Sequence, residues 1–250
     1  MHHTENTILR LVRLMRARIP AASEQKSVRK GYFLLYYERL LSLCEGAVWL
    51  SRESQDSAPP AVLLRSALEC SIDLYNLASF SEYHFVIRAM ELYDRDALFR
   101  YRAQPLYGRL EKELGEEGLR RLESESSMML REALQKAERY FPLLDAPHKL
   151  NVINRFRIAG KEELYQTEYT MLSATAHNAL ADMAIEKVLS LRLPFDRLLD
   201  ERLCSTCLRL LVDALRCSAA LLGPDEELLS GAIGLLKELK AVAPQTLPQA

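Results

Sequence analysis

The order of apolar and polar residues along the chain predicts helices throughout. Between the prolines, apolar residues recur at intervals of three and four, and no run of four or more residues alternates as a half-buried strand would. Prolines and the pair Gly223 and Pro224 mark the breaks between these stretches. The predicted helices cover residues 4–19, 24–54, 59–79, 82–102, 106–140, 161–192, 196–222 and 225–242. We therefore expect an all-α, single-domain helical bundle of about seven to nine helices.

The same pattern predicts how the chain is organised. No stretch of 20 to 50 residues repeats, so residues 1–250 are expected to form one domain. Gly115 and Gly118 predict a break within the helix at 106–140, because glycine weakens a helix interior. The tail at residues 243–250 is expected to be flexible.

The N-terminal helix predicted at residues 4–19 has one apolar face, with arginines outside it. The residues on this face are Ile8, Leu11, Val12, Met15 and Ile19. We favour packing of this face on the rest of the bundle or on a second subunit. An anionic membrane is the alternative.

The helix predicted at residues 59–79 carries its polar residues on one stripe. Two opposite sides of this helix are apolar, which is typical of a helix at the centre of a bundle. Arg65, Glu69 and Asn76 lie in line on the remaining surface. The stripe is either a solvated seam with an i,i+4 pair of Arg65 and Glu69, or a polar surface that faces another helix across the interior.

A second polar stripe occurs about 100 positions later, in the helix predicted at residues 161–192. Tyr169, Ser173 and His177 are spaced four residues apart and fall opposite the residues that mark the solvent face. Polar side chains that point inward need hydrogen-bond partners, since an unpaired buried polar group costs a few kcal/mol. The residues of the first stripe are the best partners in the chain. The predicted interior polar cluster consists of Arg65, Glu69, Asn76, Tyr169, Ser173 and His177.

Composition and charge narrow the classes of partner. With 33 basic and 34 acidic residues, the net charge of -1 provides no global field that would attract nucleic acid, so RNA is a weakly supported partner. Only 9 glycines in 250 residues leave few positions for a Gly-rich phosphate loop. No window approaches 18 uncharged apolar residues, and we expect no membrane span.

The five cysteines are scattered through apolar helical surroundings, and we expect reduced thiols in a cytoplasmic protein. Cys204 and Cys207 have the spacing of a zinc-ligand pair, but no second pair and no histidine follow at a fitting distance. We expect these thiols to be metal-free and packed in the core. Neither a metal nor a cofactor is expected.

Two quoted segments carry a resemblance to a known family. The segment LLRSALECSIDLYNL (residues 63–77), followed by ELYQTEYTMLSATAH (residues 163–177), resembles the bacterial family catalogued as domain of unknown function 5677. Members of that family carry an Arg-x-x-x-Glu helix and a later Tyr-x-x-x-Ser-x-x-x-His helix. The resemblance covers roughly residues 30–190, so the N-terminal helix at 4–19 and the C-terminal helices at 196–242 lie outside it.

The resemblance implies an all-helical fold. Its shared polar positions would be Arg65, Glu69, Tyr169, Ser173 and His177. Some relatives of the family look similar to helical ribonucleases of prokaryotic conflict systems, which is an analogy of fold.

Three functional hypotheses remain open. The first is a binding or regulatory module whose polar cluster accepts a small anionic or polar ligand, unless the cluster is simply a satisfied structural network. The second is a defence-associated ribonuclease-like enzyme with His177 as acid/base and Arg65 as phosphate clamp. Those ribonucleases place an arginine four to six residues before a histidine, and no histidine of this chain has one there. The third is a homodimeric interaction protein that uses the N-terminal or C-terminal helices. We favour the first, and lean against an enzyme.

Overall fold

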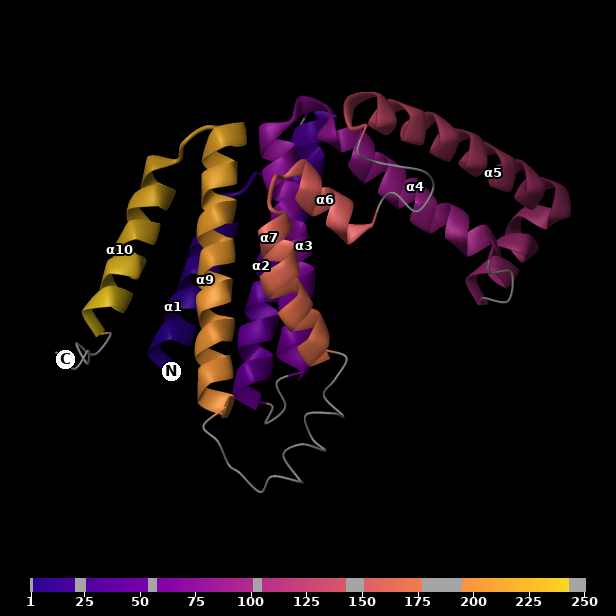
Figure 1. Cartoon of the computed structure of the whole chain (residues 1–250). Coiled ribbons are helices and arrows are strands. Elements are labelled where there is room, and N and C mark those ends of the chain that lie inside the picture. The colour runs from indigo at the N-terminus through magenta and orange to yellow at the C-terminus, as the bar shows by residue number, and fades with distance from the viewer. Residues whose placement is uncertain are drawn as a thin grey trace, which may run out of the picture. The chain divides into compact units, whose positions relative to one another are not determined.

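A computed structural model describes residues 2–20, 26–53, 58–100, 105–142, 151–176 and 195–242. In these ranges all regular secondary structure is helical, as Figure 1 shows. The elements are α1 (His2–Ala17), α2 (Val28–Glu53), α3 (Ala58–Ser79), η2 (Ser81–Tyr83), α4 (His84–Arg100), α5 (Pro105–Tyr140), α6 (Val152–Ile158), α7 (Glu162–Leu164), η3 (Tyr165–Tyr169), α9 (Phe195–Leu222) and α10 (Glu226–Val242). The predicted all-α class is confirmed.

The chain clusters into two compact units. The first unit combines Met1–Ala78 with Glu162–Ala250, and the second is Ser79–Lys161. In sequence, the second unit is therefore an insertion between α3 and α7. One domain over residues 1–250 stays a prediction, as does the flexible tail at 243–250, which lies outside the described residues.

The structure contains a break within α5 and a short helix, α6. The break predicted in the helix at 106–140 is present at Gly115, whose φ of 68° lies in the left-handed region that favours glycine. Helix α6, which has 7 residues, was not predicted from the sequence. The side chain of Asn151 caps α6, because its Oδ1 accepts a hydrogen bond from the backbone N–H of Asn154 at 3.1 Å.

In the first unit, α2 and α3 run antiparallel. Arg29, near the start of α2, donates hydrogen bonds to the carbonyls of Leu77 and Ala78 at the end of α3, at 2.6 and 2.9 Å. These carbonyls have no partner within the helix, and a cation also suits the negative end of the helix dipole. Farther along, Gly46 lets the two helices approach closely, since a Cβ there would lie 3.0 Å from a methyl group of Leu63.

The apolar face of α1 packs inside the first unit. Ile8, Leu11, Val12 and Met15 are fully buried, and α1 contacts α2, α9 and α10. This face is therefore covered by the bundle itself, which was one of the two favoured alternatives.

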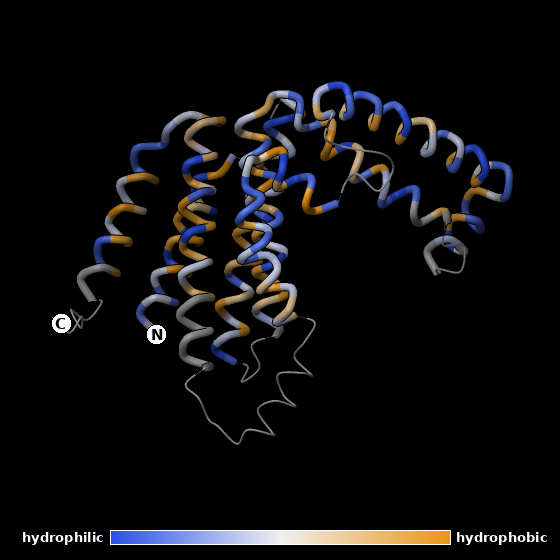
Figure 2. The backbone as a smooth tube through the Cα atoms, in the orientation of Figure 1, coloured by the Kyte–Doolittle hydropathy of each residue, from blue (hydrophilic) through white to orange (hydrophobic). Residues whose placement is uncertain are grey.

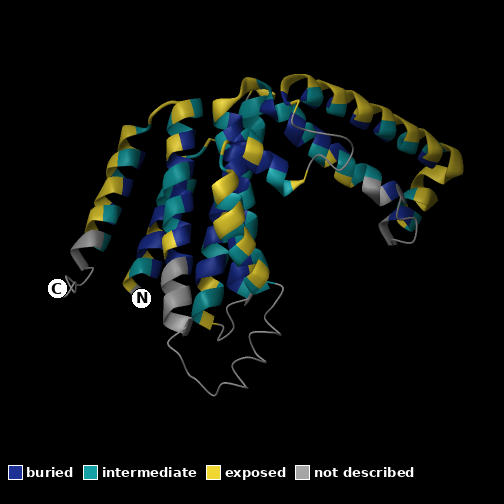
Figure 3. Ribbon diagram, in the orientation of Figure 1, coloured by how far each residue is buried: buried dark blue, intermediate teal, exposed yellow. Residues whose placement is uncertain are grey.

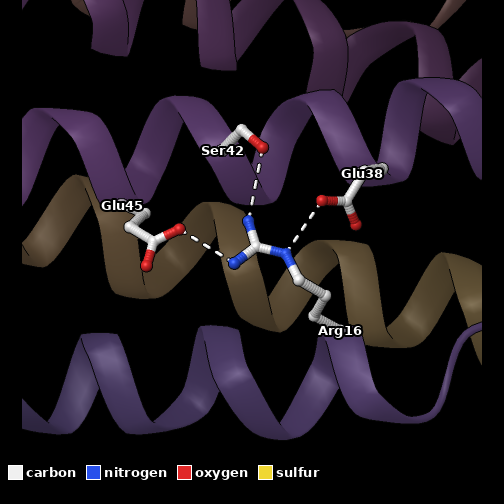
Figure 4. Close-up of polar contacts among 4 residues, drawn as sticks. All are labelled: Arg16, Glu38, Ser42 and Glu45. Carbon is white, nitrogen blue, oxygen red and sulfur yellow. Dashed lines mark hydrogen bonds and ion pairs between the residues drawn. The ribbon is translucent and has the colours of Figure 1, made fainter.

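Polar contacts fix α1 along α2. Arg16, near the end of α1, donates to Glu38 at 2.8 Å, Glu45 at 2.9 Å and Ser42 at 3.3 Å, as drawn in Figure 4. Its planar guanidinium thereby spans about two turns of α2.

A second arginine joins the other ends of the same two helices. Arg52, near the end of α2, donates to Glu5 and Asn6 of α1, both at 2.8 Å. Glu5 is 2% exposed, so this ion pair is largely removed from water. The helices α1 and α2 are therefore antiparallel.

The C-terminal helix α10 packs on α1 as well. Arg10 forms an ion pair with Glu238 at 2.7 Å, and Arg18 forms one with Glu227. A Cβ on Gly231 would lie 2.8 Å from a methyl group of Leu14, so glycine permits this close approach. Figure 3 shows buried residues along α1, α2, α3 and α9, whereas α10 exposes much of its surface.

The second unit is built on a hairpin of α4 and α5. One cluster of its core consists of Ala89, Leu92, Leu130 and Ala133, and another of Phe99, Tyr107 and Leu119. Figure 2 shows that the rest of α5 is largely hydrophilic, as expected for a helix that buries a single face. Near the ends of the hairpin, Phe141 packs edge-on against Phe80 and Tyr83.

Candidate functional site

The two motif segments meet at a hydrogen bond in the first unit. The Tyr169 hydroxyl donates to Oε1 of Glu69 at 3.2 Å, although the two residues are 100 positions apart in sequence. Glu69 lies in the middle of α3, and Tyr169 is the last residue of η3. The contact between the segments that the two stripes predict is therefore present.

Two further predicted residues lie close to the Tyr169 hydroxyl. Burial raises the pKa of Tyr169 above its ordinary value, and the charge and hydrogen bond of Glu69 raise it further. The positive charge of Arg65 and a hydrogen bond with Ser173 act in the opposite direction, because both favour the phenolate. Arg65, Glu69 and Ser173 thus all influence the phenol of Tyr169, and we call these four residues the phenol cluster.

The phenol cluster is partly open to solvent. All four of its residues are half-buried, although the sequence pattern placed Tyr169 and Ser173 in the interior. Asn76, two turns farther along α3, is fully buried. His177 lies outside the described residues, so its membership of the cluster stays a prediction, as does the role of all six residues as a site.

The segment that carries Tyr169 is not a regular α-helix. Residues Tyr165–Tyr169 form one turn of π-helix, in which hydrogen bonds join residues five positions apart. The backbone N–H and the hydroxyl of Thr170 both donate to the Tyr165 carbonyl, the hydroxyl at 3.0 Å. Residues 170–176 then continue as α-helix. Because a π-turn holds more residues than an α-turn, it changes the directions in which neighbouring side chains point.

Three residues around this turn were missed from the sequence. The ring of Tyr165 stacks on that of Tyr169, with centroids 4.9 Å apart and planes inclined by 15°. Glu168 forms a bidentate ion pair with both terminal nitrogens of Arg209 in α9. The isolated positive charge of Arg209 between the leucines of RLCSTCLRLL could have suggested a buried or half-buried partner.

The thiols of α2 and α9 form a separate, buried group. Cys44, Cys204 and Cys207 are each no more than 6% exposed, which confirms that Cys204 and Cys207 lie in the core. A hydrogen bond with Cys44, followed by burial, raises the pKa of Cys207 well above its usual value. Across the described ranges, no group of three or more His, Cys, Asp or Glu side chains is arranged to hold a metal ion. The metal-free state of Cys204 and Cys207 stays a prediction.

A comparison with known families identifies the chain. The sequence model of the family of unknown function DUF5677 matches residues 30–190. This chain belongs to that family. The match includes most of α2, all of α3 and the second unit, and η3, so the phenol cluster lies within the DUF5677 region. Helices α1, α9 and α10 lie outside it.

Other comparisons add no relative. No curated protein and no solved structure matches the chain. None of the helices in the described part of the chain is long and apolar enough to span a membrane.

Proposed function

We propose that the protein is a binding module whose site is the phenol cluster, and whose ligand is small and polar or anionic. The observation that carries the proposal is the hydrogen bond between Tyr169 and Glu69, which brings two distant segments together. Arg65 supplies a positive charge for an anionic group, while the hydroxyls of Tyr169 and Ser173 can exchange hydrogen bonds with a polar ligand. Asn76 and His177 are the further members predicted from sequence.

Partial exposure supports binding over a purely structural network. A polar network that serves only the fold is normally enclosed and satisfied within the protein. The four residues of the phenol cluster instead keep part of their surface in contact with solvent. A π-turn at Tyr165–Tyr169 adds support, because such turns occur frequently at functional sites.

A binding experiment with simple probes tests the proposal. Inorganic phosphate, acetate and glycine are titrated into protein that carries ¹³C-labelled tyrosine rings, and the Tyr169 resonance is assigned by its loss in Tyr169→Phe. We expect a saturable shift of this resonance with at least one probe, and at least a tenfold weaker affinity in Arg65→Gln. The matched control is Arg88→Gln, which removes an exposed arginine of the second unit and should leave the affinity unchanged. If no probe shifts the resonance, the proposed function is wrong.

The same protein tests the alternatives of enzyme and dimer. Cleavage of RNA by the wild type that disappears in His177→Ala would favour the ribonuclease-like enzyme instead.

We also propose a cytoplasmic location, which the contact between the Cys44 and Cys207 thiols supports, since neighbouring thiols stay reduced in that compartment. A homodimer stays a proposal that light scattering of the wild type can test.

A further inference from the structure

We propose that Arg209 of α9 is a positioning residue for the phenol cluster: by holding Glu168, it fixes the π-turn that directs the Tyr169 hydroxyl to Glu69. This inference deepens the proposed function and rests on it, because it assigns to that site a support from outside the DUF5677 region. It concerns how the residues of the site are held in position, and it can be tested on the protein without a ligand.

Two adjacent residues of the turn reach two different helices. Glu168 binds Arg209 of α9, whereas Tyr169 binds Glu69 of α3. The side chains of Glu168 and Arg209 are 25% and 39% exposed, so the pair is only partly screened by water. A bidentate contact between a carboxylate and the planar guanidinium fixes orientation as well as distance. The pair therefore restrains the direction of the residue that precedes Tyr169.

The π-turn needs such restraint. π-helix is rare and survives mostly as single turns, because its geometry is less favourable than that of the α-helix. A return of residues 165–169 to α-helical geometry would rotate Glu168 and Tyr169 away from their present partners. The stacking of Tyr165 on Tyr169 and the contact of Glu168 with Arg209 both favour the observed turn.

Helix α9 is itself anchored on another side. Cys207, two residues before Arg209, contacts Cys44 of α2, and residues two positions apart point to nearly opposite sides of a helix. Leu210 and Leu211 are also buried in the first unit. Arg209 thus projects from a firmly packed helix, which makes it a suitable fixed point for the turn.

The test measures the pKa of Tyr169 by NMR titration of ¹³C-labelled tyrosine, assigned by its loss in Tyr169→Phe. In Arg209→Gln we expect this pKa to fall toward the ordinary value of about 10, because the released hydroxyl leaves Glu69 and enters water. If Arg209 acted only through its charge, its replacement would change the pKa of Tyr169 in the opposite direction. Loss of the positive charge, with the carboxylate of Glu168 left behind, would disfavour the phenolate and raise the pKa.

Matched variants complete the experiment. Arg216→Gln removes an exposed arginine from the same helix and should leave the pKa of Tyr169 unchanged. Arg209→Lys keeps the charge without the planar fork, and we expect an intermediate fall; it replaces Arg209→Gln if that variant does not fold. An unchanged or raised pKa in the folded variant overturns the inference. Failure of every probe to bind would leave this pKa result standing, so the inference and the proposed function fail separately.

Discussion

At the scale of residues, the pKa of Tyr169 depends on its contact with Glu69. Burial and the carboxylate both raise the pKa of this phenol, so they favour its protonated form. In Glu69→Gln the negative charge is removed while the size of the side chain is kept. We expect the pKa of Tyr169 to fall in this variant, as measured by NMR titration. The control Glu91→Gln, in the second unit, should leave the pKa unchanged, and a rise in Glu69→Gln would contradict the assigned cause.

The ion pair of Glu5 and Arg52 provides a prediction on stability. Glu5 is 2% exposed and Arg52 is 17% exposed, so removal of the carboxylate leaves a half-desolvated positive charge. We expect Glu5→Ala to lower the free energy of unfolding by about 2 kcal/mol, measured by urea denaturation. Glu227→Ala is the control, because Glu227 pairs with Arg18 at a site where both side chains are well exposed. A similar loss in both variants would show that burial of the pair is unimportant.

At the scale of elements, two glycines of α10 are expected to respond differently to alanine. A Cβ on Gly234 would meet nothing within 4 Å, whereas one on Gly231 would approach Leu14 of α1. Alanine favours helix over glycine by up to about 1 kcal/mol, so Gly234→Ala should raise the melting temperature. Gly231→Ala should give no such gain, since Leu14 must first move. Equal stabilisation by both substitutions would show that α1 and α10 are not closely packed at this point.

Helices could be predicted from the sequence where a continuous apolar face is buried. The apolar residues of α1 and the stripe of α3 lie where their spacing of three and four predicts, because burial of a continuous face outweighs local preferences. The same spacing assumes an unbroken α-helix over residues 161–192, and the π-turn at Tyr165–Tyr169 breaks that assumption.

The residues that contact the π-turn could not be predicted from the sequence either. Glu168 was predicted by no pattern, because the rotation that brings it to Arg209 depends on the register of the π-turn and on the packing of α9. The short helix α6 was missed because 7 residues carry too little periodicity to distinguish a helix from a loop.

At the scale of the whole molecule, three groups with raised pKa values predict sensitivity to alkali. Burial raises the pKa of Tyr37 and of Tyr169, and contact with Cys44 together with burial raises that of Cys207. A group whose pKa is higher in the folded state stabilises the fold below its unfolded pKa, and this contribution is lost as the pH rises toward the folded value. We expect the melting temperature to be steady near neutral pH and to fall above about pH 9, where unfolded thiols and then phenols ionise.

Substitutions can distinguish the loss of stability caused by these groups from a loss caused by general charge repulsion at high pH. Tyr37→Phe should show a weaker loss of melting temperature between about pH 9 and pH 11, because its ring can no longer ionise on unfolding. Tyr140→Phe is the control, since Tyr140 is 46% exposed. Circular dichroism at each pH provides the measurement. The same loss in Tyr37→Phe as in the wild type would exclude Tyr37 as a cause.

The insertion of Ser79–Lys161 between the two motif segments has a consequence for the order of folding. The bond between Tyr169 and Glu69 closes a loop of 100 residues, and closure of a long disordered loop costs conformational entropy. About 80 of those residues belong to the inserted unit, whose radius of gyration would be roughly 28 Å unfolded and roughly 12 Å folded. Early folding of the insertion would therefore shorten the effective loop. The segment with Tyr169 would then reach α3 late, after the insertion has been synthesised and has become compact.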